Sequence, residues 1–271
     1  MRQVRGLAPL ILLPWIVVPG NALTGTPGID DRIVDLTHVF DEQTVYWPTA
    51  RSFELEVVAS GQTDAGFWYA ANNISLAEHG GTHVDAPVHF AEGKRTVDEI
   101  PVEQLIGPAV VIDVRTQAAS DPDYRLSTED IEEWESDNGR IPDGAIVLML
   151  SGWGERWPDK QAYLGTNAPG DVDNLHFPGY SAEAAEFLRS ERSVDAVGVD
   201  TPSIDHGQST DFTVHRILSA ANIPGLENVA NLDRLPLSGA TVVALPMKIG
   251  DGSGAPARII AFVPQGEGGQ E

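Results

Sequence analysis

The sequence contains no cysteine. Disulfide bonds and thiolate catalysis are therefore excluded, and a bound metal could draw only on nitrogen and oxygen ligands. Positive charge is also scarce, with 17 Lys and Arg residues against 40 Asp and Glu residues and a formal net charge of −23. A surface with this charge repels nucleic acids and anionic membranes, so neither is expected as a partner.

Long hydrophobic runs are absent except at the start of the chain. Arg2 and Arg5 precede an almost purely apolar stretch over residues 6–19, which small residues follow. This pattern predicts a secretory signal peptide over residues 1–24 and a secreted or periplasmic protein. A permanent membrane anchor is the alternative, but the run is short for a membrane span and contains Pro14.

The sequence has no visible repeat and no low-complexity linker, so residues 25–271 are expected to form one domain. Its 27 Gly and 19 Pro residues are scattered as turn signals between short elements. Alternating or β-branched apolar residues predict strands over 32–36, 53–58, 67–76, 109–114, 145–150, 194–199, 240–245 and 259–263. Helices are expected over 127–137, 181–188 and 211–221. The expected fold class is mixed α/β, with residues 53–58 in a half-buried strand.

Three histidines and one aspartate lie within eleven residues, in a chain with only seven histidines. They are His79, His83, Asp85 and His89. Imidazole nitrogens and a carboxylate oxygen suit a divalent metal such as zinc or manganese. Gly80, Gly81 and Pro87 argue against a helix, so we expect a strand end or tight loop that turns the side chains toward one point.

The spacing predicts that His79, His83 and Asp85 bind a metal and leave positions open for water and substrate. The plainer alternative is that all three make hydrogen bonds in a turn. His89 could be a fourth ligand, a neighbour that supports a ligand, or a general acid and base. The spacing alone does not choose among these roles.

A second group of polar residues lies downstream, where His215 and Glu227 stand twelve residues apart. They flank an expected helix end and turn, and they could take part in the same site. The alternative is a structural one, in which His215 makes ordinary hydrogen bonds and Glu227 pairs with Arg216.

The run from His79 to Phe90, HGGTHVDAPVHF, resembles the hallmark HxGTHxDxPxHF of the metal-dependent cyclase-like hydrolases. This family includes bacterial kynurenine formamidases and isatin hydrolases. The blocks Asp200-Thr201 and Glu227-Asn228 also fit, so the resemblance covers nearly all of the chain after the expected signal peptide. It implies a single domain with a central mixed β-barrel-like sheet and peripheral helices, usually assembled as a homodimer or a larger oligomer.

The resemblance also implies roles for individual residues. His79, His83 and Asp85 would bind the metal, and His89 would be the catalytic acid and base. His215 and Glu227 match positions that hold a second metal or face the substrate. Mn²⁺ is the expected metal and Zn²⁺ the alternative, since nitrogen and oxygen ligands accept both.

Within the family, several stretches look more like the isatin hydrolases. Among them are residues 46–50 and 66–72, which carry Trp47, Phe67, Trp68 and Tyr69. These rings could form a flat apolar wall for a planar bicyclic substrate. Alternatively, half of them are ordinary core residues, since neighbouring side chains along a strand point to opposite faces.

The expected reaction is therefore the hydrolysis of a small aromatic lactam such as isatin to an amino-acid anion (isatinate), by water that a metal activates. An arylformamidase acting on N-formylkynurenine is the rival enzyme. A secreted metal- or ligand-binding protein without turnover is the alternative from another class. His89 beside an incomplete set of ligands argues against that last alternative.

Overall fold

The computed structural model describes residues 31–264, so the expected signal peptide over 1–24 lies outside the described residues. The strands are β1 (Arg32–Asp35), β2 (Glu54–Gln62), β3 (Trp68–Ser75), β4 (His83–Asp85), β5 (Ile106–Asp113), β6 (Arg125–Leu126), β7 (Ile146–Leu150), β8 (Gly179–Tyr180), β9 (Ala196–Val199), β10 (Gly225–Glu227), β11 (Ser238–Pro246) and β12 (Gly254–Val263). The helices are α1 (Arg115–Ser120), α2 (Thr128–Asn138), α3 (Lys160–Leu164), α4 (Ala182–Glu191) and α5 (Thr213–Ala220). Short 3₁₀ helices cover Pro87–His89, Val97–Glu99, Val102–Leu105, Trp153–Arg156 and Leu232–Arg234.

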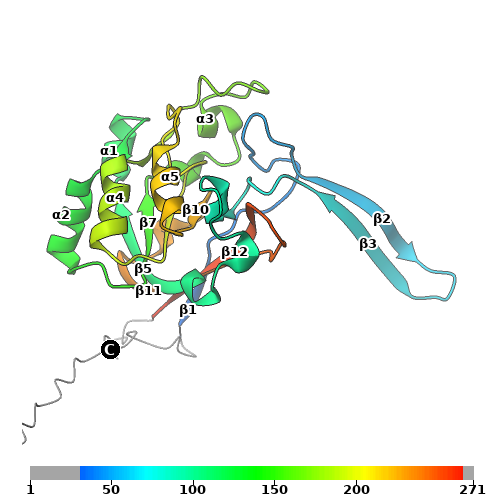
Figure 1. The fold of residues 1–271 in the computed structure, drawn as a ribbon. Coiled ribbons are helices and arrows are strands. Elements are labelled where there is room, and N and C mark those ends of the chain that lie inside the picture. Colours follow the sequence, from blue (N-terminus) through cyan, green and yellow to red (C-terminus); the bar gives the residue numbers. More distant parts are fainter. Residues whose placement is uncertain (1–30, 265–271) are drawn as a thin grey trace, which may run out of the picture.

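Seven strands form a closed mixed barrel, in the order β12-β11-β5-β7-β9-β10-β4, and β4 returns to pair with β12. The pairs β5–β7, β7–β9 and β9–β10 are parallel, and the other pairs are antiparallel. β1 pairs with the last residues of β12, beyond the part of β12 that pairs with β4. Helices α2, α4 and α5 cover one side of the parallel strands (Figure 1). The expected mixed α/β fold with a barrel-like sheet is confirmed.

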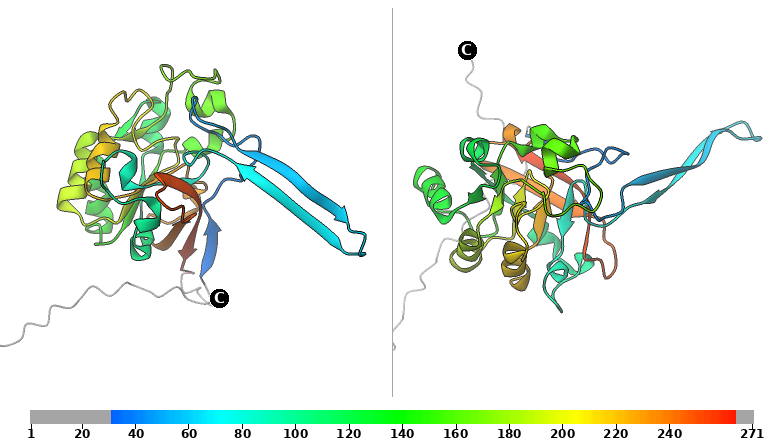
Figure 2. Two further views of the ribbon diagram at one scale, coloured as in Figure 1. Left: turned by 45° about the vertical axis from the view of Figure 1, so that its right-hand side comes forward. Right: turned by 90° about the horizontal axis from the view of Figure 1, so that it is seen from above.

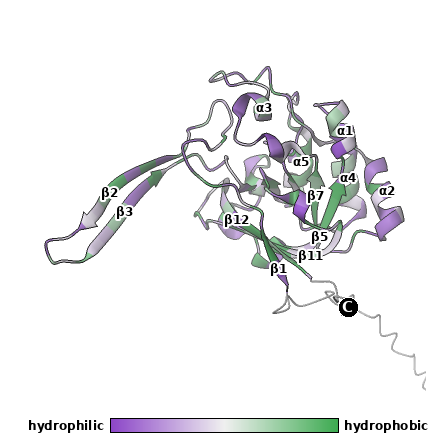
Figure 3. Ribbon diagram, turned by 180° about the vertical axis from the view of Figure 1, so that it is seen from behind, coloured by the Kyte–Doolittle hydropathy of each residue, from purple (hydrophilic) through white to green (hydrophobic). Residues whose placement is uncertain are grey.

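The parallel strands are apolar along their whole length because both of their faces are buried. In β5, Ala109 and Val111 pack into the barrel interior, whereas Val110 and Ile112 pack under the helices. β7 divides in the same way, with Leu148 inside the barrel and Met149 on the helix side. The apolar residues therefore concentrate in the sheet, as Figure 3 shows for β5, β7 and β12.

The helix boundaries follow the sequence signals. Ser127 caps α2 by accepting from Asp130 N, and the Asp130 carboxylate accepts from Ser127 N in return. Gly139 ends this helix with φ 86°. Ser181 caps α4 in the expected position. Among residues 31–264, no helix is both long and apolar enough to cross a lipid bilayer.

Strands β2 and β3 form a separate two-stranded hairpin that projects from the barrel in every view (Figures 1 and 2). The prediction of a half-buried strand over residues 53–58 is wrong. Leu55, Val57 and Val58 are between 54% and 63% exposed. The alternation of apolar and acidic residues identified the strand correctly, but it does not tell whether the apolar face packs on the chain's own core.

Candidate metal centre and active site

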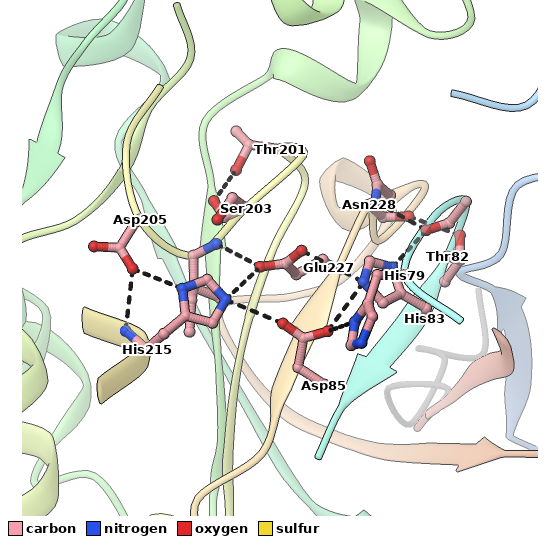
Figure 4. Close-up of polar contacts among 12 residues, drawn as sticks. His79, Thr82, His83, Asp85, Thr201, Ser203, Asp205, His215, Glu227 and Asn228 are labelled. Carbon is pink, nitrogen blue, oxygen red and sulfur yellow. Dashed lines mark hydrogen bonds and ion pairs between the residues drawn. The ribbon is translucent and has the colours of Figure 1, made fainter. Parts of the chain in front are cut away.

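The centre of the site is β4, which lies between β10 and β12. His83 and Asp85 are two residues apart on this strand, so their side chains share a face, while Val84 packs into the barrel core. Gly81 makes the turn before the strand with φ 57°, a conformation that favours glycine. The expected strand end is therefore present, and the side chains it carries converge with those of β10 and α5 (Figure 4).

Asp85 is the residue that the other side chains surround. Its Oδ1 lies 2.6 Å from His79 Nδ1 and 3.1 Å from His83 Nε2. Its Oδ2 lies 3.0 Å from His215 Nε2. The Asp85 side chain is only 5% exposed, so these contacts form away from bulk water.

Glu227, at the end of β10, closes the group from the other side. Its Oε2 lies 3.5 Å from His83 Nε2, and its Oε1 lies 3.1 Å from His215 Nε2. Ile204 N donates to Oε1 at 2.9 Å and fixes the carboxylate. Glu227 therefore contacts the two imidazoles and has no ion pair with Arg216 among the described residues, against the structural alternative.

His89 lies beside His79, at the end of the 3₁₀ helix Pro87–His89. Its ring stacks on His79 with the centroids 3.8 Å apart, and it lies 6.2 Å from the ring of His215. No hydrogen bond to a described residue uses either of its ring nitrogens. The structure thus brings together all six residues that the sequence indicated.

The pKa of His89 is shifted in the opposite direction to the pKa of the buried His83. Burial would raise the pKa of Asp85, but the charge of His79 and the hydrogen bonds from His215 and His79 hold it well below its usual value. Burial likewise opposes charge on His83, but the contacts with Asp85 and Glu227 outweigh it and raise the pKa of His83 to about 9. In His89, burial lowers the pKa to about 4, so this imidazole is neutral at neutral pH.

These residues fit a divalent cation. His83 Nε2 is buried without a hydrogen-bond partner among the described residues, although two carboxylates lie within 3.5 Å. Two sets have their ligand atoms within 4.8 Å of one another: His79, Asp85 and His89, and His83, Asp85 and Glu227. A cation between such nitrogen and oxygen atoms would neutralise the buried carboxylates and bind the imidazoles in their deprotonated form. Asp85 belongs to both sets, so the two candidate ligand sets share one carboxylate.

A cavity of about 80 Å³ opens beside the ligands, and His79, His83 and Glu227 form part of its wall. Trp47 also lines it, as the sequence predicted for a substrate contact. Its ring contacts Phe177 edge-on and Phe212 at a tilt, with the ring centroids 6.3 Å apart in each pair.

The other three aromatic residues are not brought to this cavity within one chain. Phe67, Trp68 and Tyr69 belong to the β2–β3 hairpin and are 57%, 62% and 50% exposed. The expectation that they line the site of their own chain is therefore not met. They follow a β-strand pattern, but the hairpin carries that strand away from the barrel.

Sequence reasoning missed the residues that hold the ligands in place. Asp205 accepts from both Nδ1 and the backbone N of His215, at 2.6 and 3.1 Å. Ser253, on the segment before β12, lies 2.8 Å from His79 Nε2 and donates to Glu78. The signal for Asp205 was present, since it precedes His206 in the downstream polar block. Nothing in the sequence connects Ser253 with His79, 174 residues away.

The comparisons with known proteins agree with this geometry. Residues 34–206 match the model of the cyclase family, described as "Putative cyclase". The isatin hydrolase of Roseibium aggregatum is 35% identical over 250 residues, which cover 89% of this chain and 90% of that protein. The kynurenine formamidase of Salinibacter ruber is 28% identical over 84% of this chain and 96% of that protein. A crystal structure of an isatin hydrolase bound to the product analogue thioisatinate superposes with a TM-score of 0.79, at 33% identity, and covers 86% of this chain and 92% of that one.

The chain belongs to the cyclase family. It is an enzyme, a metal-dependent hydrolase like its relatives in that family. The alternative of a binding protein without turnover is therefore set aside.

Proposed function

We propose that this enzyme opens the lactam ring of isatin, or of a similar small aromatic lactam, and releases the amino-acid anion (isatinate). The observation that carries this proposal is the convergence of six ligand-type side chains beside a cavity with an aromatic wall. The isatin hydrolase relative supports the substrate class, because its match extends over nearly the whole of both chains.

The ligands would be His79, His83 and Asp85, with Glu227 and His215 completing the site or holding a second ion. A divalent cation bound there would act as a Lewis acid toward the amide carbonyl and would make a bound water acidic at neutral pH. Mn²⁺ is the metal we propose, with Zn²⁺ as the alternative. The absence of cysteine supports a hard or borderline ion over a thiophilic one.

His89 would serve as the proton carrier of the reaction. Its ring nitrogens have no partner among the described residues, and burial keeps it neutral at neutral pH, so one ring nitrogen has a free lone pair that can take up a proton. It would take a proton from the attacking water as the new C–O bond forms. It would return that proton to the ring nitrogen as the C–N bond breaks, which restores neutral His89. The new carboxylic acid would release its remaining proton to solvent and leave as the carboxylate.

Trp47 would bind the flat face of the substrate. It lines the cavity beside the ligands, and its position is fixed by two neighbouring phenylalanine rings. An aromatic wall of this kind favours a planar ring over a flexible chain, because stacking orders the ligand at little entropic cost.

The rival activity is hydrolysis of the linear formamide N-formylkynurenine. The kynurenine formamidase relatives support it, because the match covers most of their length. Their identity to this chain is lower than that of the isatin hydrolase. Both activities hydrolyse an amide C–N bond, which lies in a planar ring in isatin and in a linear formamide in N-formylkynurenine. Comparing kcat/KM for isatin and for N-formylkynurenine distinguishes them.

The decisive experiment combines metal analysis with an isatin ring-opening assay followed by absorbance. We expect His83→Ala to lose both metal and activity, because it removes a buried ligand between two carboxylates. We expect His89→Ala to retain the metal and lose turnover. If the His89 variant opens isatin as fast as the parent, the acid–base role is wrong; if it loses its metal, His89 is a ligand.

We also propose that the enzyme is a homodimer whose hairpins pack on the second copy. β2 and β3 pair only with each other among the described residues, and a lone two-stranded sheet is marginally stable in water. Yet Val57, Trp68 and Ile74 on this hairpin are more than half exposed. Light scattering tests the proposal: Trp68→Glu should shift the parent dimer toward monomer, and an unchanged dimer would contradict it.

The protein is proposed to be secreted or periplasmic, on the basis of the basic and apolar pattern of residues 1–24. Expression of the full chain in a bacterium, followed by mass spectrometry of the periplasmic protein, tests for cleavage near residue 24. Intact full-length protein in the cytoplasm would contradict this proposal.

A further inference from the structure

A second cavity adjoins the one beside the candidate ligands. It has a volume of about 180 Å³ and shares Tyr46, Trp47 and Leu164 with the first cavity. Its other walls come from residues 48–52 and 160–169. A hydrogen bond from Gly170 N to Pro48 O, at 2.9 Å, joins these two segments. The second cavity is therefore part of the folded body of the chain, and Tyr46, Trp47 and Leu164 border both cavities.

The first cavity is too small to hold a substrate alone. Its volume of about 80 Å³ is well below the roughly 300–1,000 Å³ of typical ligand pockets. A reacting carbonyl must lie at the ligands His79, His83 and Asp85, so the rest of the substrate has to extend away from them. Past Trp47 and Leu164, the second cavity offers that space.

Lys160 lines this second cavity, and it is one of only three lysines in the chain. Its side chain is half-buried, and among residues 31–264 it has no ion-pair partner. Two neighbouring carboxylates are engaged elsewhere: Asp159 accepts from Ala162 N, and Asp171 accepts from Thr166 and Asn174. Glu155, five residues before Lys160, forms no ion pair with it. In a chain with 40 acidic residues, a half-buried ammonium group without a carboxylate partner is an available anion-binding group.

The other polar groups around the cavity are also suited to an anion. Ser52 and Asn167 line it, and neither side chain makes a hydrogen bond to a described residue. No Asp or Glu residue contributes to its wall. The residues around the cavity thus include a lysine, a serine and an asparagine but no carboxylate, together with the aromatic residues Tyr46 and Trp47.

We propose that this cavity, hereafter the Lys160 subsite, binds an anionic substituent of the substrate. The natural substrate would then be an aromatic lactam or amide whose ring carries a carboxylate, with the reacting carbonyl at the metal ligands and the carboxylate against Lys160. The inference rests on the proposed function, because it assigns the substrate of the same site.

The test compares isatin with isatins that carry a carboxylate at each benzene-ring position in turn. We expect the parent enzyme to prefer at least one carboxylate isomer in kcat/KM. In Lys160→Met, the ratio of kcat/KM for that isomer to kcat/KM for isatin should fall about tenfold, as expected for loss of a charge-assisted hydrogen bond. Lys160→Arg should keep most of the preference. Raising the ionic strength should reduce it in the parent.

Lys248→Met is the matched control, since it removes the same charge from an exposed lysine that lines neither cavity. It should leave the ratio unchanged. The inference is overturned if the kcat/KM ratio does not change in Lys160→Met, or if the parent prefers none of the carboxylate isomers. Either result leaves the proposed hydrolysis of isatin in place.

If the parent opens neither isatin nor any carboxylate isomer, the proposed function fails. Calorimetric titration with the carboxylate isomers then tests the Lys160 subsite without turnover. Binding that is about tenfold weaker in Lys160→Met than in the parent supports it, and equal binding, or none to the parent, overturns it.

Discussion

The carboxylate of Asp205 lies 2.6 Å from Nδ1 of His215 and also accepts from the backbone N–H of the same residue. This contact leaves Nε2 of His215 facing Asp85 and Glu227, at 3.0 and 3.1 Å. Burial opposes charge on His215, but the three carboxylates outweigh it and hold the pKa of this imidazole well above its usual value. Asp205 therefore fixes both the orientation and the proton position of a residue at the heart of the site.

Replacing Asp205 by Asn should weaken metal binding or activity by about 10- to 100-fold, the usual cost of losing a partner of a ligand histidine. Asn keeps an oxygen at the Oδ1 position that can accept from the backbone N–H of Val214, so the fold should remain, while the acceptor for His215 is lost. Metal content and kcat/KM measure the effect. Asp211→Asn, which removes a carboxylate bonded only to the exposed Thr213 hydroxyl, should behave as the parent. Equal activity in both variants would contradict the positioning role.

Removing the metal should destabilise the fold, because the ligand carboxylates are buried. Asp85 and Glu227 are 5% and 6% exposed in their side chains, and a cation would neutralise both. Binding at one hundred times the dissociation constant contributes about 2.7 kcal/mol. For a domain of this size, that corresponds to a rise in Tm of several degrees.

Calorimetric scans with a chelator, and after adding back Mn²⁺ or Zn²⁺, measure this difference. His83→Ala serves as the control and should melt at the same temperature under all conditions. A parent protein whose Tm does not respond to chelator or to added metal would rule out the metal centre as proposed.

Gly80 lies directly under the ring of Tyr46. A Cβ at position 80 would stand 2.0 Å from Tyr46 Cδ1 and 2.2 Å from Cε1, distances that no real contact allows. Gly80→Ala should therefore displace a tyrosine that lines both cavities and cost about 1–3 kcal/mol of unfolding free energy. Urea unfolding and the isatin assay should both show the loss.

The control for this substitution is Gly61→Ala on the hairpin, where a Cβ would meet nothing within 4 Å. It should leave stability unchanged or slightly raise it. The double variant Tyr46→Leu/Gly80→Ala should recover part of the loss, because the two positions are in contact. A Gly80→Ala protein as stable as the parent would contradict the steric argument.

The sequence predicted the site more completely than its supporting contacts. His79, His83, Asp85 and His89 lie in one short run, so their types and spacing already indicated a metal. Ser127 and Gly139 likewise indicated the two ends of α2, because capping residues act on the residues next to them in the sequence. By contrast, the pairing of β4 with β12 joins segments about 170 residues apart, and no local pattern encodes such a contact.

The hairpin shows the other limit. Strand periodicity depends only on the alternation of side chains along the backbone, and β2 and β3 have it. Which surface the apolar side chains meet is decided by the path of the chain. Trp68 and Val57 therefore looked like core or substrate-binding residues, although the structure places them on a projecting ribbon.

Glu135 on α2 and Arg192 after α4 join the two outer helices by a paired contact. Arg192 Nε and an Nη donate to the two carboxylate oxygens at 2.7 and 2.6 Å, and Ile141 N donates to Oε1 at 2.8 Å. Both side chains are mostly buried, at 13% and 10% exposure. The hydrogen bonds from Arg192 lower the pKa of Glu135, more than burial raises it.

Because the pKa of Glu135 is lower in the folded state than in the unfolded state, the pair stabilises the fold fully above the unfolded value of about 4.5. The stabilisation is lost as the pH falls through the folded pKa, where the carboxylate takes up a proton. Glu135→Gln should therefore cost about 2 kcal/mol at pH 7 and progressively less below about pH 4. Glu186→Gln breaks the exposed pair with Arg189 and should cost much less than Glu135→Gln at pH 7, because solvent and salt screen an exposed ion pair. Urea unfolding of both variants from about pH 7 down to pH 3 measures these differences in unfolding free energy. If the loss in Glu135→Gln does not change with pH, packing and not the charge of Glu135 holds α2 to the end of α4.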